Sequence, residues 1–314
     1  MTKHFLTDTD FNVTQVSQIF QLARRLKGNR HSSEVKPLEG QSWGMIFFKN
    51  STRTRISFEV GIYELGGNAV VLSADQMQIG RGETIADTAK VISRYLDGVV
   101  VRCFDHAVLE ELAEHGTIPV INALSDFLHP CQTYTDYFTL AERWAKGPQD
   151  LVTSLKGRKI VFFGDCASNM AYSITLTGLL LGLEVVLSGP EDFKPGKELD
   201  DAIAKAGLPT YTFTTDAEEA ARGADVLYAD VFVSMGDEAE KDARMAAMMP
   251  YQVNMELLKK AKKDAYFLHC LPAHAGEEVS QEVLDHPASI IFDQAENRLH
   301  VQKAIMAKLS EAYK

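Results

Sequence analysis

Residues 43–65 read WGMIFFKNSTRTRISFEVGIYEL, a stretch in which an apolar run, a polar hexapeptide and a helical pattern follow one another. The apolar run predicts a buried strand, and the pattern that begins at Ile56 predicts a helix. A helix begins with about four N–H groups that lack partners within the helix and with the positive end of its dipole, which together suit a phosphate dianion. The stretch therefore predicts a strand, an anion site and a helix in direct succession.

Two kinds of side chain in the polar hexapeptide, residues 50–55, favour an anion site. Ser51 and Thr52 supply hydroxyls of the type that cap helices, and Arg53 and Arg55 supply fixed positive charge with planar forks of donors. The alternative is an ordinary serine-capped helix with two surface arginines. Only the rest of the chain separates these two interpretations.

The composition is that of a globular protein. The chain has 314 residues, of which 46% are hydrophobic and 24% charged, so it is long enough to bury a sizeable core and to form two domains. Its formal net charge of −11 argues against a broad nucleic-acid footprint or a polybasic membrane patch. An anionic ligand therefore needs a local basic pocket.

The sequence gives no sign of secretion, membrane insertion or metal binding. The first twenty residues contain acids and no unbroken apolar segment, and no run approaches the roughly 18 apolar residues of a membrane span. Cys103, Cys131, Cys166 and Cys270 are far apart and form no CxxC pair. We expect a cytoplasmic protein with reduced thiols and with neither a metal nor another cofactor.

Short apolar or β-branched runs alternate with helical segments along the chain. Runs that are apolar throughout, such as residues 99–101 and 160–163, are typical of strands buried on both faces of a parallel sheet. We expect an α/β protein with two doubly wound parallel-sheet domains. The predicted strands are residues 45–48, 69–72, 99–102, 119–121, 159–163, 184–187, 210–213, 226–228, 265–268 and 289–292.

A segment with glycine and proline, residues 143–158, interrupts this alternation at mid-chain. We therefore expect a first domain of residues 1–147 and a second of residues 148–293. Residues 294–314 read as one amphipathic helix that completes the first domain. Because ligands of open α/β sheets bind outside the carboxyl ends of the strands, the active site is expected in the cleft between the domains.

Polar and reactive side chains follow the predicted strands. In the first half they are residues 51–55, Arg102 and His129-Pro130-Cys131-Gln132, and in the second half they are residues 164–169, residues 230–236 and His269-Cys270-Leu271-Pro272. Because each group stands at a strand's carboxyl end, two half-sites that face each other are expected.

With these motifs, the chain resembles the aspartate and ornithine carbamoyltransferase family over nearly its whole length. Residues 51–55 are similar to the carbamoyl-phosphate loop of both branches, whereas residues 129–132, Asp230 with Ser234-Met235-Gly236, and residues 269–272 are similar to signatures of the ornithine branch. The resemblance implies transfer of the carbamoyl group from carbamoyl phosphate to the δ-amine of L-ornithine, giving L-citrulline and phosphate. It also implies homotrimers, or multiples of them, with shared active sites.

The resemblance assigns roles to individual residues. It implies that carbamoyl phosphate is bound by Ser51, Thr52, Arg53, Thr54, Gln78 of a neighbouring subunit, Arg102, His129, Gln132, Cys270, Leu271 and Arg298. It implies that ornithine is bound by Asn169, Asp230, Ser234 and Met235. The residues implied in catalysis are Arg102, His129, Gln132, Asp230, Cys270 and Arg298.

The chemistry of the reaction agrees with these roles. Arg102 and His129 can donate to a carbonyl oxygen that becomes anionic in the tetrahedral intermediate, and Gln132 can accept from the carbamoyl NH₂. A departing phosphate oxygen is itself a competent proton acceptor, so His129 is assigned to polarisation and not to general-base catalysis. Taken singly, each residue has an ordinary alternative: His129 as a capped loop histidine, or Cys270 as a small buried side chain.

Three positions depart from the usual family pattern, namely Tyr134, Phe232 and Ala275. Tyr134 keeps a modified ornithine open as the second substrate, whereas residues 234–236 favour a free α-amino acid over putrescine. Aspartate is disfavoured because the aspartate branch recognises a dicarboxylate with added basic residues and lacks the signature at residues 234–236. A nicotinamide-dependent oxidoreductase is disfavoured because residues 163–167 lack a GxGxxG motif after their strand. A catalytically inactive relative would have lost a key residue, and none is lost.

Overall fold

A computed structural model describes residues 4–30, 36–49, 51–73, 77, 82–233 and 241–311 of the protein. The chain forms two compact units. Unit 1 consists of Met1–Val152 with Glu296–Lys314, and unit 2 of Thr153–Ala295.

The elements of unit 1 are α1 (Val13–Gly28), β1 (Ser42–Phe47), α2 (Thr52–Glu64), β2 (Asn68–Ser73), α3 (Ile85–Ile92), β3 (Gly98–Arg102), α4 (Ala107–His115), β4 (Val120–Leu124), α5 (Pro130–Trp144) and the short 3₁₀ helix η2 (Pro148–Asp150). The long helix α12 (Ile291–Glu311) begins at the end of unit 2 and belongs to unit 1 from Glu296 onward.

The strands and α-helices of unit 2 are β5 (Lys159–Phe163), α6 (Asn169–Leu180), β6 (Glu184–Ser188), α7 (Lys197–Ala206), β7 (Thr212–Thr214), α8 (Ala217–Ala221), β8 (Val226–Ala229), α9 (Lys241–Met248), α10 (Met255–Lys260), β9 (Tyr266–His269) and α11 (Gln281–Leu284). Its short 3₁₀ helices are η3 (Thr153–Leu155), η4 (Glu191–Phe193) and η6 (Met249–Tyr251).

Both sheets are parallel, as the sequence predicted. The order of strands is β2-β1-β3-β4 in unit 1 and β7-β6-β5-β8-β9 in unit 2, and every pairing between these strands is parallel. In each sheet the chain adds strands first on one side of the first strand, β1 or β5, and then on its other side. Doubly wound sheets bind ligands at the point where this order of strands reverses. The two predicted parallel-sheet α/β domains are confirmed.

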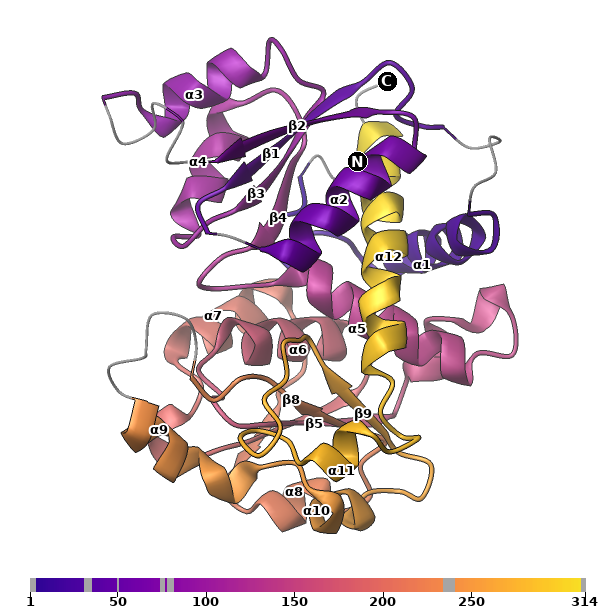
Figure 1. Ribbon diagram of the computed structural model, residues 1–314, viewed down its shortest axis with the longest axis vertical. Coiled ribbons are helices and arrows are strands. Elements are labelled where there is room, and N and C mark those ends of the chain that lie inside the picture. The colour runs from indigo at the N-terminus through magenta and orange to yellow at the C-terminus, as the bar shows by residue number, and fades with distance from the viewer. Residues whose placement is uncertain are drawn as a thin grey trace. The chain divides into compact units, whose positions relative to one another are not determined.

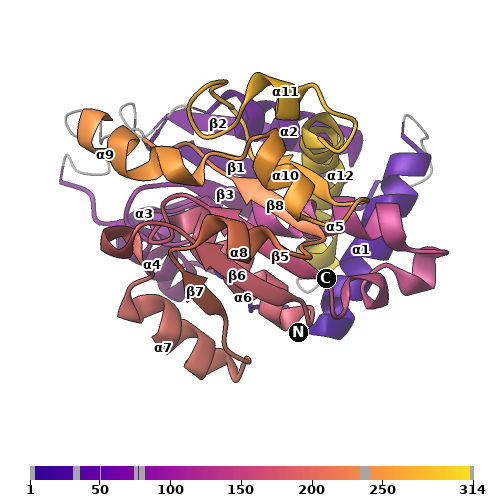
Figure 2. The same ribbon diagram turned by 90° about the horizontal axis from the view of Figure 1, so that it is seen from below.

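Helices lie on both faces of each sheet. In unit 1, α3 and α4 cover one face, and α2 and α12 lie on the other (Figure 1). In unit 2, α6 and α7 lie on one face, and α8, α10 and α11 on the other (Figure 2). Strands covered on both faces need apolar side chains throughout, and all five residues of β3 are buried.

Local sequence sets the ends and spacings of several elements. An Asn12–Gln15 capping box starts α1, and Pro130, which needs no N–H partner, occupies the first turn of α5. Gly98 begins β3 and lies against the ring of Trp43. A Cβ at position 98 would lie 2.6 Å from that ring, which is too close, so only glycine fits there. The wide Trp43 side chain can therefore fill the core of unit 1 only beside a glycine.

One predicted strand is wrong. Residues 289–292 were expected to form a strand, but only Ser289 bridges to β9, opposite Phe267, and helix α12 begins at Ile291. A short apolar run cannot be told from a buried helix start by periodicity alone. No helix in the described ranges is long and apolar enough to cross a membrane.

Helix α12 carries a histidine in an unusual environment. The side chain of His300 is fully buried, and neither ring nitrogen has a hydrogen-bond partner within the described ranges. Burial, together with the positive charges of Lys303, Lys27 and Arg30, lowers the pKa of His300 to about 4. The histidine is therefore neutral in the folded protein at physiological pH.

We expect His300 to make the protein less stable in mild acid. In the unfolded chain a histidine has a pKa near about 6.5, so below that pH the unfolded state binds a proton that the folded state does not. Between pH 7 and pH 5 the free energy of unfolding should fall by about 2 kcal/mol on account of this residue. Urea unfolding of the wild type and of His300→Phe at the two pH values measures the effect, and equal losses in both proteins would contradict it.

Candidate active site

The predicted anion loop stands at the start of α2. Ser51 is the N-cap residue in an extended conformation, but its hydroxyl makes no capping hydrogen bond to the described residues, and the helix begins at Thr52. Thr54 is buried, whereas Arg53 and Arg55 are exposed and Arg55 Nε lies 3.4 Å from Glu59 Oε2. The loop therefore combines a buried threonine with exposed cations at a helix N-terminus.

Four further predicted residues meet in unit 1 behind this loop. Arg102 ends β3, His129 and Gln132 begin α5, and Arg298 comes from α12; all four are buried. Arg298 donates through Nη1 to Gln132 Oε1 and through Nη2 to Thr54 Oγ1, the latter at 3.4 Å. Helix α12 thus connects the anion loop with the first turn of α5.

His129 is held neutral in this cluster. Burial lowers its pKa well below the usual value, and the positive charges of Arg298 and Arg102 lower it further. A neutral imidazole donates one hydrogen bond from a ring N–H without carrying a charge of its own. The cluster can therefore polarise a carbonyl oxygen with two fixed cations and one neutral donor.

Two positioning residues in unit 1 were not predicted. Asp136 Oδ1 accepts from Gln132 Nε2 at 2.7 Å, which fixes the orientation of that amide. When the Gln302 amide is turned so that its oxygen faces Arg298, that oxygen accepts from Nη2 and Nε at 3.0 Å each. Gln302 follows Arg298 by four positions, and this helical spacing was the feature of the sequence that could have identified Gln302 as a neighbour of Arg298.

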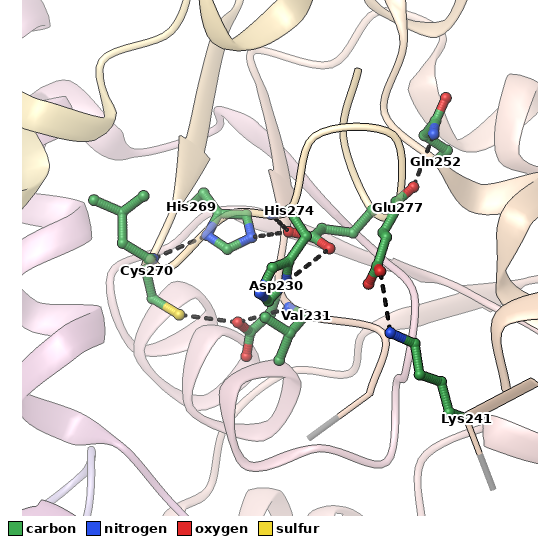
Figure 3. Close-up of polar contacts among 10 residues, drawn as sticks. Asp230, Val231, Lys241, Gln252, His269, Cys270, His274 and Glu277 are labelled. Carbon is green, nitrogen blue, oxygen red and sulfur yellow. Dashed lines mark hydrogen bonds and ion pairs between the residues drawn. The ribbon is translucent and has the colours of Figure 1, made fainter. Parts of the chain in front are cut away.

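Three further predicted residues lie in unit 2, each after one of three neighbouring strands. Asn169 opens α6, whose N-cap Ser168 accepts from the Ala171 N–H at 3.3 Å; Asp230 follows β8, and Cys270 follows β9. Cys270 Sγ donates to Asp230 Oδ1 at 3.0 Å, and the Val231 N–H donates to the same oxygen at 2.9 Å (Figure 3). An anionic carboxylate and a thiol therefore stand together at this edge.

A buried hydrogen-bond network supports the turn after β9. His269 Nδ1 accepts from the Leu271 N–H at 2.9 Å, so the ring proton is on Nε2, which lies 3.1 Å from Glu278 Oε1 (Figure 3). The same oxygen accepts from the His274 N–H at 2.6 Å. Burial raises the pKa of Glu278, but the hydrogen bonds from His269 and His274 outweigh it, and the pKa lies below its usual value.

This network holds an uncommon backbone conformation. Leu271 has φ of 62°, in the left-handed region that a leucine rarely adopts. The sequence singled out His269 and Leu271 but not Glu278, because nothing in the local pattern marks a glutamate six residues beyond the motif as the partner of His269.

Three predicted residues lie outside the described ranges: Gln78, Ser234 and Met235. Two of the residues that depart from the family pattern lie in the cores of their units. Tyr134 is fully buried among Phe5, Phe11 and Phe20, and its hydroxyl donates to the backbone oxygen of Asp8 at 2.9 Å. Phe232 is also buried. Tyr134 therefore serves the packing of unit 1.

The chain is similar to known proteins over nearly its whole length. Residues 3–142 match the family described as aspartate/ornithine carbamoyltransferase, carbamoyl-P binding domain, and residues 156–309 match its Asp/Orn binding domain. The ornithine carbamoyltransferase of Thermococcus kodakarensis is 48% identical over 303 residues, which are 95% of this chain and 93% of that protein. The anabolic ornithine carbamoyltransferase of Pyrococcus furiosus is 45% identical over 95% of this chain and 93% of that protein.

A solved structure gives the same result. The ornithine carbamoyltransferase structure from Pyrococcus furiosus superimposes with a TM-score of 0.88 and 43% identity, and covers 98% of this chain and 96% of that one. The chain belongs to the aspartate/ornithine carbamoyltransferase family.

Proposed function

We propose that the protein transfers the carbamoyl group of carbamoyl phosphate to the δ-amine of L-ornithine, giving L-citrulline and phosphate in arginine biosynthesis. The observation that carries the proposal is the cluster in unit 1, where Arg298 contacts Gln132 and Thr54 beside a neutral His129. The relatives named as ornithine carbamoyltransferases, one of them anabolic, support the choice of ornithine and of the biosynthetic direction.

Unit 1 would bind carbamoyl phosphate, mainly through residues 1–147 and the helix 294–314. The phosphate would take the N-terminal amides of α2, the hydroxyls of Ser51, Thr52 and Thr54, and the charges of Arg53 and Arg298, a combination suited to a dianion. The family match over residues 3–142 supports this assignment.

The carbamoyl group would lie against Arg102, His129 and Gln132. Arg102 and His129 would donate to its oxygen, which gains negative charge as the amine attacks; one such donor is worth about 3–4 kcal/mol in other enzymes. Gln132 Oε1 already accepts from Arg298 and would receive the carbamoyl NH₂ on its second lone pair.

Unit 2 would bind ornithine, with Cys270 and Leu271 at the reacting end. Asp230 carries the negative charge that an amino group needs, and Asn169, Ser234 and Met235 would bind the amino-acid end. The neutral δ-amine attacks the carbamoyl carbon, the bond to the phosphate oxygen breaks, and the surplus amine proton leaves with the phosphate. The reaction needs no covalent enzyme intermediate and no cofactor.

A substrate panel tests the proposal. Purified protein is given carbamoyl phosphate with ornithine, N-acetylornithine, putrescine or aspartate, and the ureido product is measured. Ornithine should give the highest kcat/KM by at least about 10²-fold, because only ornithine combines a free α-amino acid end with a δ-amine, and a site built for both leaves polar groups unpaired with the other three compounds. A higher rate with any of the other three would overturn the assignment of the second substrate.

We expect kcat/KM for ornithine to rise with pH. The attacking amine has a free pKa of about 10. Below that pH, its neutral fraction grows about tenfold for each unit by which the pH is raised. His129, whose pKa is already lowered well below 6.5, should not limit this rise. Initial rates at saturating carbamoyl phosphate from pH 6 to pH 9 measure the profile, and a flat profile would count against direct attack by the amine.

The proposal extends to assembly and location. We propose a cytoplasmic homotrimer, or a multiple of it, in which Gln78 enters the active site of the neighbouring subunit. The motif around Gln78 supports this arrangement by its resemblance to the family. Sedimentation equilibrium of the purified protein should give a mass that is a multiple of three chains, and a monomer with full activity would contradict shared sites.

A further inference from the structure

The turn after the His269-Cys270-Leu271-Pro272 motif gathers three side chains of metal-binding type. One donor atom each of His274, Glu277 and Glu278 lies within 4.8 Å of the others. We propose that these three residues bind one divalent transition-metal ion of the zinc class. The site uses Oε2 of Glu278, whereas His269 contacts Oε1, and it belongs to no step of the proposed reaction.

The strongest evidence is a buried carboxylate oxygen. Glu278 is fully buried, and its Oε1 accepts from His269 and from the His274 N–H. Its Oε2 is also buried and has no hydrogen-bond partner among the described residues. An anionic oxygen left unpaired in the protein interior is costly, and a cation is the natural partner for it.

The geometry around Oε2 suits a small metal ion. His274 Nδ1 lies 3.7 Å from Glu278 Oε2, which is too long for a hydrogen bond. Two ligands of a tetrahedral zinc ion, each about 2.0–2.1 Å from the metal, lie roughly 3.3 Å apart. A shift of a few tenths of an ångström therefore converts this pair into two ligands of one ion.

The other two residues can reach the ion from the solvent side. His274 is about half exposed, and no hydrogen bond to its ring nitrogens occurs within the described ranges. Glu277 Oε1 lies 3.4 Å from Lys241 Nζ in a surface ion pair, and such pairs contribute little to stability because solvent screens them. The Glu277 carboxylate can therefore turn to a metal, and water completes the coordination.

The donor set selects the class of metal. One imidazole nitrogen and two carboxylates suit zinc, cobalt or nickel, whereas magnesium and calcium prefer an all-oxygen shell with more ligands. An ion at Oε2 leaves the hydrogen bonds at Oε1 in place. The turn that carries Cys270 and Leu271 is therefore retained when the site is filled.

A neighbouring cluster, Asp230 with His269 and Cys270, is a weaker candidate. His269 has no lone pair to offer, because Nδ1 accepts from the Leu271 N–H and Nε2 carries the proton shared with Glu278. The Cys270 thiol donates to Asp230. A metal would have to break these three contacts before it could bind.

Isothermal titration of the full-length protein with zinc chloride tests the proposal. The wild type should bind one zinc ion per chain and should bind magnesium at least about 10²-fold more weakly. His274→Ala and Glu277→Gln should each weaken zinc binding at least about tenfold, since each removes a ligand. Glu278 is left intact because its replacement would disturb the turn.

Two matched variants make the result decisive. Glu282→Gln removes the same charge from an exposed position outside the cluster and should leave zinc binding unchanged. Cys270→Ser removes the thiol of the neighbouring cluster and should also bind zinc as the wild type does. The proposal fails if the wild type binds no zinc, if His274→Ala binds it normally, or if Cys270→Ser is the variant that loses it.

Discussion

Replacing Arg298 with alanine is expected to lower kcat/KM by about 10²- to 10³-fold, which corresponds to about 3–4 kcal/mol of transition-state stabilisation. The guanidinium is buried and contacts Gln132 and Thr54, so its loss removes the proposed phosphate contact and leaves the Gln132 oxygen without its charged donor. Direct titration with carbamoyl phosphate alone should show a similar loss of affinity. The two contacts that the substitution removes, with Gln132 and with the proposed phosphate site beside Thr54, both lie in unit 1.

Two variants on the same helix separate charge from geometry. Arg298→Lys keeps the positive charge but not the planar fork, so its kcat/KM should fall between those of the wild type and the alanine variant. Lys308→Ala removes a surface cation that lies 3.6 Å from Glu311 and should change the rate less than about twofold. If Arg298→Ala retained the wild-type rate with an unchanged urea midpoint, Arg298 would have no place in the site.

Much of the fold was predictable because a strand that is buried on both faces of its sheet consists almost entirely of apolar residues. The residues of β3 and β5 are apolar nearly throughout, and these strands occupy the interior of their sheets. The predicted strand at residues 289–292 failed because Ile290 and Ile291 are buried as a helix begins, and periodicity does not distinguish the two cases.

The site was predictable only in part, and the reason is again physical. A motif shows which residues stand at the end of a strand, so the positions of Arg102, Asp230 and Cys270 followed from the pattern. Partners supplied by distant segments leave no such record. Glu278 could not have been chosen from the other acids of the chain, since its role depends on how a loop folds back on β9.

Two substitutions of His269 are expected to separate the stability of unit 2 from ornithine turnover. Asparagine places an amide oxygen near the position of Nδ1, and glutamine places an amide nitrogen near that of Nε2. His269→Asn therefore keeps the acceptor for the Leu271 N–H and loses the donor to Glu278, whereas His269→Gln does the reverse. Each variant removes one end of the same network.

The His269→Asn variant should lose stability and keep most of its turnover. Its buried Glu278 carboxylate keeps the His274 N–H but loses a hydrogen bond to a charged group, which costs about 1.5–3 kcal/mol. Urea unfolding monitored in unit 2 measures this loss. The ornithine kcat/KM of the variant, taken well below its unfolding midpoint, should stay within about tenfold of the wild type because the Leu271 N–H remains held.

The glutamine variant should instead lose turnover. Without an acceptor for its N–H, Leu271 is released from its left-handed conformation, and displacement of a substrate-positioning group by about 1 Å can cost 10²-fold in rate. We expect kcat/KM for ornithine to fall by about 10- to 100-fold, while affinity for carbamoyl phosphate, whose proposed ligands lie chiefly in unit 1, changes little. If both variants lost stability and turnover in the same proportion, the network would be a structural support alone, and the hydrogen bond from the Leu271 N–H to His269 would have no separate part in the turnover of ornithine.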